Sequence, residues 1–170
     1  AGKGPLALTP SGVARGGKEI MGRPAGWGGL DHRRDCSALT RDLFAPCGIF
    51  LPRNSTTQSK VGLGVSLAGL SMPEKEAIIR SDGVPFSSLL WLRGHIGLYL
   101  GEYQGKAMLF HNMWGLRTKD GQGGCDGRAV VGKAVVTTLL PGVERNDLCH
   151  PGSFLERMER LVVLPGSASQ

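Results

Sequence analysis

The spacing of apolar residues changes character about halfway along the chain. In the first half, apolar positions recur at the three- and four-residue spacing of one helix face. The pattern predicts helices that begin at residues 9–11, at Cys36, at Asn54 or Ser55, and at Ser71. Ser71 and Glu74 have the spacing of a capping box, so the helix that they open is expected to run to Arg80.

The second half is predicted to form strands, because short apolar or alternating runs are separated by glycine turns. The predicted strands are residues 89–92, 95–100, 106–113 and 128–140. A short helix is expected from Ser153, before a strand-like Val-Val-Leu end, and the glycine-rich residues 62–64 and 121–124 are interpreted as turns. Helices followed by an antiparallel sheet predict an α+β fold. We expect residues 1–8 to be a tail and residues 9–170 to form a single domain.

Composition limits the class of protein. The chain has 170 residues, of which 41% are hydrophobic and 20% charged, which is typical of one folded domain. It contains no apolar run long enough to span a bilayer, so no transmembrane segment is expected. A net charge of +6 suits an anionic partner, but aromatic residues make up only 6%. That scarcity argues against nucleic-acid binding, because stacking platforms are needed to hold single strands.

Cysteines supply the first candidate chemistry. The four are Cys36, Cys47, Cys125 and Cys149. They form no CxxC pair and have no zinc-like spacing, so neither a metal nor another cofactor is expected. Cys125 and Cys149 could form one disulfide. Structural roles are favoured for these two and for Cys47.

Cys36 differs from the other cysteines because it lies in the first turn of its predicted helix, on the apolar stripe. Its sulfur is therefore expected to point toward whatever the helix packs against. Unpaired N–H groups at a helix N-terminus favour a thiolate and lower the pKa of a thiol. An attacking cysteine needs this environment. The alternative is a cysteine that only packs in the core.

Two histidines are expected to meet on one face of a hairpin. If residues 101–105 form its loop, His95 lies directly opposite His111. A one-residue slip of register would instead place Asn112 opposite His95 and exchange the two faces. In either register a polar group that can orient an imidazole lies beside His95. Each histidine alone is more often a surface or core residue than a catalytic one.

The same residues carry a family resemblance. The segments GWGGLDHRRDCSALTRDLFAPCGIFLPRNSTTQS, GHIGLYLG and FHNMWG resemble the NlpC/P60 cell-wall peptidases. Within that family the chain is similar to the subgroup that carries bacterial SH3 modules ahead of the catalytic domain. The resemblance implies a papain-like α+β fold and a bacterial cysteine endopeptidase. It also implies a peptidoglycan stem peptide as substrate, cut between γ-D-glutamate and the diamino acid.

The resemblance also assigns roles to the three candidates. Cys36 is the nucleophile, His95 the general base and His111 the residue that orients the base. The expected resting state is a thiolate–imidazolium pair of Cys36 and His95. One oxyanion donor is expected to be the backbone N–H of Cys36.

Substrate contacts are implied for Asp35, Ser37 and Trp27. Asp35 is expected to meet a free ammonium group on the peptide. The resemblance further implies an extracytoplasmic location and upstream SH3-like modules as partners. Two alternatives stay open at this point. One is a related papain-like amidase or acyltransferase that uses the same Cys and His, and the other is a catalytically silent wall-binding module.

Overall fold

One antiparallel sheet organises the protein. The structure, a computed structural model, describes residues 6–26, 34–150 and 153–166. Within these residues six strands form the sheet, in the order β1-β6-β2-β3-β4-β5. The strands are β1 (Leu63–Ser66), β2 (Ser88–Leu92), β3 (His95–Tyr103), β4 (Lys106–Thr118), β5 (Gly127–Thr138) and β6 (Met158–Val163). All neighbouring strands run antiparallel.

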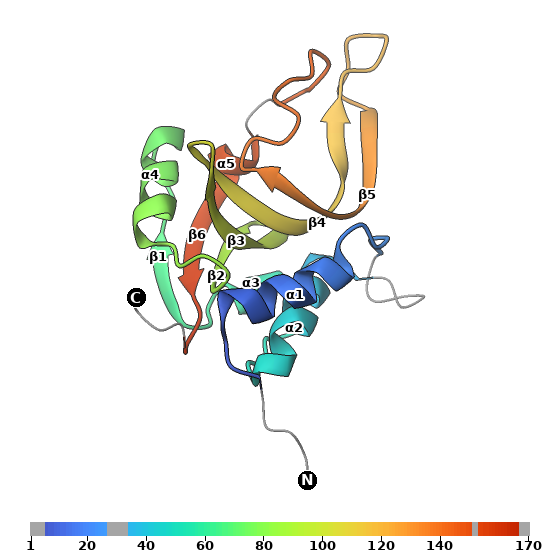
Figure 1. Ribbon diagram of the computed structural model, residues 1–170. Helices are drawn as coiled ribbons and strands as arrows, with labels where there is room; N and C mark the ends of the chain where they lie inside the picture. The colour runs from blue at the N-terminus through green and yellow to red at the C-terminus, as the bar shows by residue number, and fades with distance from the viewer. Residues whose placement is uncertain (1–5, 27–33, 151–152, 167–170) are drawn as a thin grey trace.

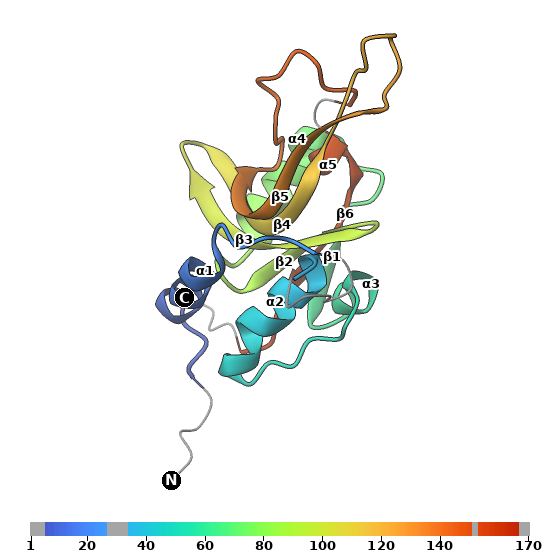
Figure 2. The same ribbon diagram turned by 90° about the vertical axis from the view of Figure 1, so that its right-hand side faces the viewer.

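Helices cover both faces of the sheet. They are α1 (Pro10–Ile20), α2 (Cys36–Phe44) with the 3₁₀ turn η2 (Ala45–Cys47), α3 (Ser55–Gln58), α4 (Met72–Asp82) and α5 (Ser153–Arg157). Figure 1 shows α1 and α2 against one side of the sheet, and α4 and α5 on the other. Figure 2 shows α2 beside the sheet, where it packs against β3 and β4. The observed order, with most helices before an antiparallel sheet, confirms the predicted α+β fold.

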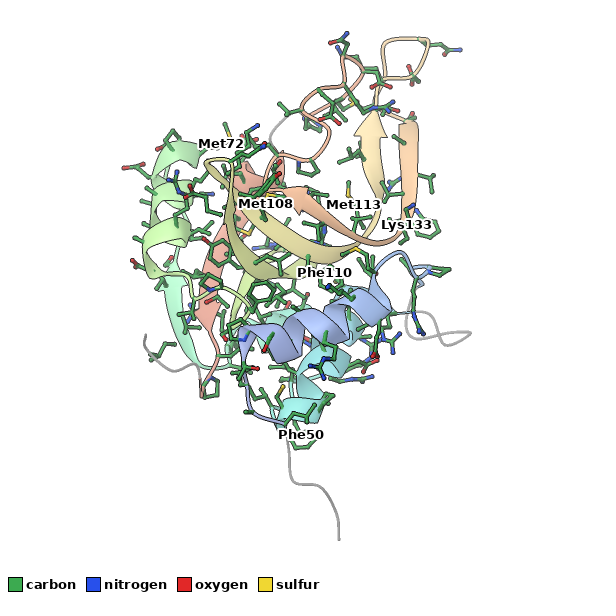
Figure 3. All side chains as sticks on the ribbon, in the orientation of Figure 1. Phe50, Met72, Met108, Phe110, Met113 and Lys133 are labelled. Atoms are coloured by element: carbon green, nitrogen blue, oxygen red, sulfur yellow. A yellow bond between two sulfur atoms is a disulfide. The ribbon has the colours of Figure 1, made fainter. Side chains whose placement is uncertain are left out.

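Two hydrophobic clusters fill the space between these layers. Leu98 and Phe110 pack into the cluster under α1 and α2, whereas their neighbours Tyr99 and Leu109 pack into the cluster under α4 and α5. Adjacent strand residues point to opposite faces, so one alternating pattern supplies both clusters. Phe110 points from β4 toward α1 (Figure 3), where Gly17 leaves room for its ring.

Local signals fix where the main helices begin. The Thr9 side chain accepts a hydrogen bond from the N–H of Gly12 and caps α1. The Ser71 hydroxyl accepts a hydrogen bond from the backbone N–H of Glu74, and the Glu74 carboxylate accepts one from the backbone N–H of Ser71. The predicted capping box of α4 is therefore confirmed. Asn54 caps the short helix α3. Such caps satisfy N–H groups that a helix cannot pair internally, which is why sequence alone locates these helix starts.

Two predictions about the strands are wrong. Residues 62–64 are not only a turn, because β1 begins at Leu63 and pairs with β6 at the sheet edge. Leu63 is 78% exposed, so this strand carries no buried pattern to reveal it. Residues 101–105 are not a loop either. β3 continues to Tyr103, and the turn consists of Gln104 and Gly105, both with positive φ (49° and 75°) as in a tight two-residue hairpin.

This shorter turn pairs Lys106 with Tyr103 instead of Leu100, a shift of three residues, and a β-bulge between Tyr99 and Gly101 of β3 reduces the shift to two beyond it. Leu98 pairs with Phe110, which means that His95 does not lie directly opposite His111 as predicted. Since side chains alternate with a period of two, the net shift of two leaves the paired side chains beyond the bulge on their predicted face. The two histidines therefore still share a face of the sheet.

Loops at the far end of β4 and β5 are joined covalently. Cys125 and Cys149 form a disulfide with their Cα atoms 5.7 Å apart, within the usual range, so the possible bridge is confirmed. It links the β4–β5 connection to the loop before α5, and both loops project beyond the sheet (Figure 1). No helix in the described part of the chain is long and apolar enough to cross a membrane.

Candidate active site

Cys36 is the first residue of α2 and lies at the edge of a cavity. Asp35 caps the helix by accepting the N–H of Ala38 at 2.8 Å. The half-buried Cys36 sulfur interacts with the backbone N–H of Ile96, which directly follows His95 at the start of β3. Cys36 and His95 line the same cavity, whose volume is about 400 Å³. The helix start and the strand start thus bring the predicted nucleophile and base to one site.

The two imidazoles are hydrogen-bonded to each other. The distance from His95 Nε2 to His111 Nδ1 is 2.8 Å, and the rings meet edge to face with centroids 5.0 Å apart. They are diagonal neighbours across β3 and β4 rather than direct partners, and side chains as long as histidine can span that diagonal. The predicted juxtaposition is therefore present, reached through a different register.

A chain of hydrogen bonds fixes which nitrogens carry protons. The Thr137 hydroxyl donates its single proton to the Thr138 carbonyl at 2.7 Å. Thr137 Oγ1 must then accept the hydrogen bond from Nε2 of His111, which lies 3.0 Å away. Nε2 of His111 therefore carries the proton of that ring. Nδ1 of this neutral ring is consequently an acceptor.

The same reasoning extends to the ring of His95. Since His111 Nδ1 accepts, His95 Nε2 must donate to it. In a neutral His95 the remaining nitrogen, Nδ1, then carries a free lone pair. Nδ1 is therefore the nitrogen of this ring that is left to accept a proton, and His95 and Cys36 line the same cavity.

An aromatic side chain from α5 packs against both rings. Phe154 meets the rings of His95 and His111 edge-on, with centroids 5.3 Å and 5.6 Å away. Burial and, as the smaller cause, the positive charge of Arg157 together lower the pKa of His95 to about 4. Burial also lowers the pKa of His111 well below its ordinary value. Both rings are therefore neutral at physiological pH.

The thiol is also neutral in the resting site. Burial raises the pKa of Cys36, and although the N–H of Ile96 favours the thiolate, the negative charge of Asp35 raises the pKa again. The prediction that the helix N-terminus holds this pKa below the ordinary value is wrong, because burial outweighs the few N–H groups near the sulfur. The resting pair is a thiol and an imidazole, not the expected thiolate and imidazolium.

Asp35 and Ser37 are already engaged with neighbouring groups. Arg53 holds both Asp35 oxygens, at 2.7 Å and 3.2 Å. Burial opposes ionisation of Asp35, but the hydrogen bonds that it accepts, led by that from Arg53, outweigh burial and lower its pKa. Asp35 lines the cavity, whereas Ser37 is only 5% exposed and lies outside the lining, with its hydroxyl bonded to the Arg53 carbonyl at 2.8 Å. Trp27 lies outside the described residues.

Asn112, the alternative partner of the base, has a different role. It lies on the other face of β4, and its Nδ2 donates to the carbonyls of Arg34 and Asp35 at 2.6 Å and 3.2 Å. The one-residue slip that would have brought it to His95 does not occur. Asn112 instead fixes the backbone that leads into the nucleophile. Among the described residues, no group of three histidine, cysteine or acidic side chains is placed to hold a metal.

Sequence reasoning missed three side chains of this site: Thr137, Phe154 and Arg53. Thr137 lies on β5, and only the pairing of His111 with Val135 shows that it is within reach. The short helix from Ser153 was predicted, but the sequence contained no signal for the direction in which the ring of Phe154 points. Arg53 follows a proline in a loop, where no periodicity applies.

A helix-borne cysteine beside a strand-borne histidine, with a second polar residue orienting that histidine, is the constellation of a papain-like cysteine hydrolase. The model of the NlpC/P60 family matches residues 22–124, a stretch that includes Cys36, His95 and His111. The chain belongs to the NlpC/P60 family. The resemblance to these cell-wall cysteine peptidases is thereby confirmed.

Known relatives agree with this assignment. The chain is 37% identical over 93 residues to the peptidoglycan DL-endopeptidase CwlO of Bacillus licheniformis, covering 50% of this chain and 19% of that protein. An NlpC/P60 endopeptidase of Photobacterium damselae subsp. piscicida superposes with a TM-score of 0.75 at 28% identity, over 89% of this chain and 38% of that one. An NlpC/P60 protein of Bacillus cereus (TM-score 0.59, 18% identity, 94% and 42% covered) supports the fold alone. The chain thus spans well under half the length of these relatives.

Proposed function

We propose that this protein is a cell-wall cysteine endopeptidase that hydrolyses peptidoglycan stem peptides at the γ-D-glutamyl–diamino acid bond. One observation carries the proposal. The hydrogen-bond chain from Thr138 through His111 leaves His95 with a free Nδ1 in the cavity that Cys36 lines. Family membership and the named activity of the CwlO relative support the choice of substrate.

The neutral resting pair determines how the reaction begins. As the sulfur of Cys36 attacks the amide carbonyl carbon, its proton passes to Nδ1 of His95, so no stable ion pair has to form beforehand. The carbonyl oxygen gains the negative charge, which the Cys36 N–H at the helix N-terminus can stabilise. His95 then protonates the leaving amine, the C–N bond breaks, and a thioester remains.

Hydrolysis of the thioester reverses these roles. His95 takes a proton from water, the resulting hydroxide adds to the thioester carbon, and the C–S bond breaks. The proton returns to the sulfur, which releases the peptide carboxylic acid and restores the thiol. His111 holds the imidazole in one orientation throughout, and Phe154 packs edge-on against both rings.

We propose that Asp35 meets a free ammonium group of the substrate, in competition with Arg53. Asp35→Asn should weaken peptide binding more than it changes the reactivity of Cys36 toward a thiol reagent, because asparagine retains the cap of α2. Equal losses of binding and of thiol reactivity would contradict this role. Contacts from Ser37 and Trp27 stay predictions from the family resemblance.

We also propose an extracytoplasmic location, upstream SH3-like modules as partners, and residues 9–170 as one catalytic domain. The disulfide between Cys125 and Cys149 supports the location, since such bonds persist in oxidising compartments. Val13 of α1 and Val162 of β6 pack in one cluster, which supports a single domain.

Digestion of defined muropeptides tests the function. The wild-type protein should release fragments cut at the γ-D-glutamyl–diamino acid bond, identified by mass spectrometry, and Cys36→Ala should release none. Cleavage elsewhere would change the assigned bond, and intact muropeptides would favour the silent wall-binding module. A thioester trapped with a lipid rather than a peptide would indicate the amidase or acyltransferase alternative.

A further inference from the structure

The cavity that Cys36 lines is rich in positive charge. Four arginines contribute to its wall: Arg93, Arg117, Arg128 and Arg157. All four are exposed, and within the described part of the chain none forms an ion pair. Among the described residues of this wall, Asp35 alone is acidic, and it is already paired with Arg53. The free protein therefore leaves the positive charge of its cleft without a matching anion.

Two of these arginines face each other directly. Arg117 of β4 and Arg128 of β5 are cross-strand partners, so their side chains leave the same face of the hairpin from neighbouring positions. Like charges in such a pair destabilise a sheet, and an opposite charge is the favourable partner. An anion bound between the two guanidinium groups would remove that repulsion.

The other two arginines lie close to the catalytic base. Arg157 of α5 donates from Nη2 to the Arg93 carbonyl in the β2–β3 turn at 3.2 Å, which holds its guanidinium beside the start of β3. Its charge acts on His95, as the lowered pKa of that ring shows. A second basic position thus lies at the catalytic end of the cleft.

The spacing of the two basic positions suits an extended peptide. Met113, which lies beside Lys133 on the β4–β5 pair (Figure 3), lines the same cavity as Cys36. Arg117 follows four residues later, about 13 Å further along the strand at roughly 3.3 Å per residue. An extended peptide of a few residues covers that length, with one end at Cys36.

We propose that these arginines are carboxylate-binding subsites, so that the cleft selects stem peptides with free carboxylates over the same peptides with carboxamides. The proposal rests on the proposed function and names the chemical form of its substrate. A guanidinium donates two parallel hydrogen bonds to a carboxylate, and a neutral carboxamide cannot match that charge-assisted pairing. Arg117 and Arg128 bind one carboxylate, and Arg93 and Arg157 bind a second nearer the scissile bond.

Binding to the inactive protein tests this selection without requiring hydrolysis. Calorimetric titration of Cys36→Ala would use two γ-D-glutamyl–diamino acid peptides that differ only in free carboxylates or carboxamides. The free acid should bind at least about 10-fold more tightly, and Arg117→Gln or Arg128→Gln in the same background should remove most of that difference. Arg15→Gln, an exposed change of equal charge on α1 outside the cavity, should leave it intact.

A second measurement, of the melting temperature, tests the repulsion between Arg117 and Arg128. Arg117→Gln should raise the melting temperature of the free protein slightly, whereas Arg15→Gln should not. Equal affinity for acid and carboxamide, or no binding of either, would overturn the proposal, and so would an equal loss in Arg15→Gln. If the wild-type protein cleaves both peptides equally well, the proposed function stands and this selection fails. If Cys36→Ala prefers the acid but the wild type cleaves neither, the selection stands and the proposed function fails.

Discussion

The two ends of the cleft are built in opposite ways. At the catalytic end, His111 is fully buried, both of its ring nitrogens have partners, and Phe154 covers it. At the far end, Arg117 and Arg128 are exposed and face each other, and neither has an acidic partner within residues 6–26, 34–150 and 153–166. A β-bulge in β5, opposite residues 113–115 of β4, separates the two ends. The first end is satisfied within the protein, whereas the second gains its missing interactions only when an anion binds.

This difference assigns separate tasks to the two ends. Chemistry requires a fixed geometry, since a displacement of about 1 Å can cost roughly 10²-fold in rate. Selection among substrates requires groups that are left unpaired in the free protein. Mutations at the catalytic end should therefore change turnover, and mutations at the far end should change binding.

The largest effect is expected for the nucleophile. Cys36→Ala should reduce hydrolysis by at least about 10⁴-fold, because no other group can form the thioester. Circular dichroism should show an unchanged fold. Cys47→Ala is the matched control, since Cys47 packs at the edge of the core under α2 and lies outside the cavity. Residual hydrolysis in Cys36→Ala, or equal losses in both variants, would contradict the assignment of the nucleophile.

A smaller loss is expected for the orienting histidine. His111→Ala should lower kcat by roughly 10²-fold, because His95 keeps its place on β3 but loses the acceptor for Nε2. Steady-state kinetics with a defined muropeptide measures this loss. Wild-type kcat in His111→Ala would show that the contact between the rings is only structural.

A loss of about 10-fold in kcat is expected for Thr137→Val. Valine has a similar shape but cannot accept from His111 Nε2, so the proton distribution of both rings is no longer fixed. KM should stay near its wild-type value, because Thr137 lies outside the catalytic cavity and acts through His111. Thr137→Ser should restore kcat. An unchanged kcat in the valine variant, or no recovery with serine, would exclude this positioning role.

Acid should weaken the fold through the same rings. The pKa of His95 falls from its ordinary value of 6.5 to about 4 in the folded protein, so the unfolded chain binds more protons between these values. The contribution of the neutral His95 to the free energy of unfolding is therefore fully present above pH 6.5, and it is lost as the pH falls toward 4. The free energy of unfolding, measured by chemical unfolding at several pH values, should depend less steeply on pH in His95→Gln than in the wild-type protein. An equal slope in both proteins would contradict the lowered pKa.

Local signals explain why much of the fold could be predicted. The caps at Thr9, Asp35 and Ser71 act within four residues, so the sequence contains both partners of each interaction. Alternating residues placed His95 and His111 on one face, and that result survived a wrong loop because a β-bulge in β3 turned the three-residue shift at the turn into an even one at the histidines. An odd shift would have separated them.

The remainder depends on contacts between distant segments. Thr137 meets His111 only because β5 pairs with β4, and Phe154 reaches both rings only after α5 packs on the sheet. The pKa of Cys36 was mispredicted for the same reason. The helix N-terminus is a local feature, but the burial that outweighs it comes from the sheet on which α2 packs.

The protonation of the two imidazoles is the most direct test of the account. Long-range proton–nitrogen NMR spectra of the wild-type protein near pH 7 report which ring nitrogen carries the proton. We expect His95 and His111 both to be neutral and protonated at Nε2, with Nδ1 of His95 bare. A proton on Nδ1 of a neutral His95 would contradict the account, because that ring could not accept the proton of Cys36.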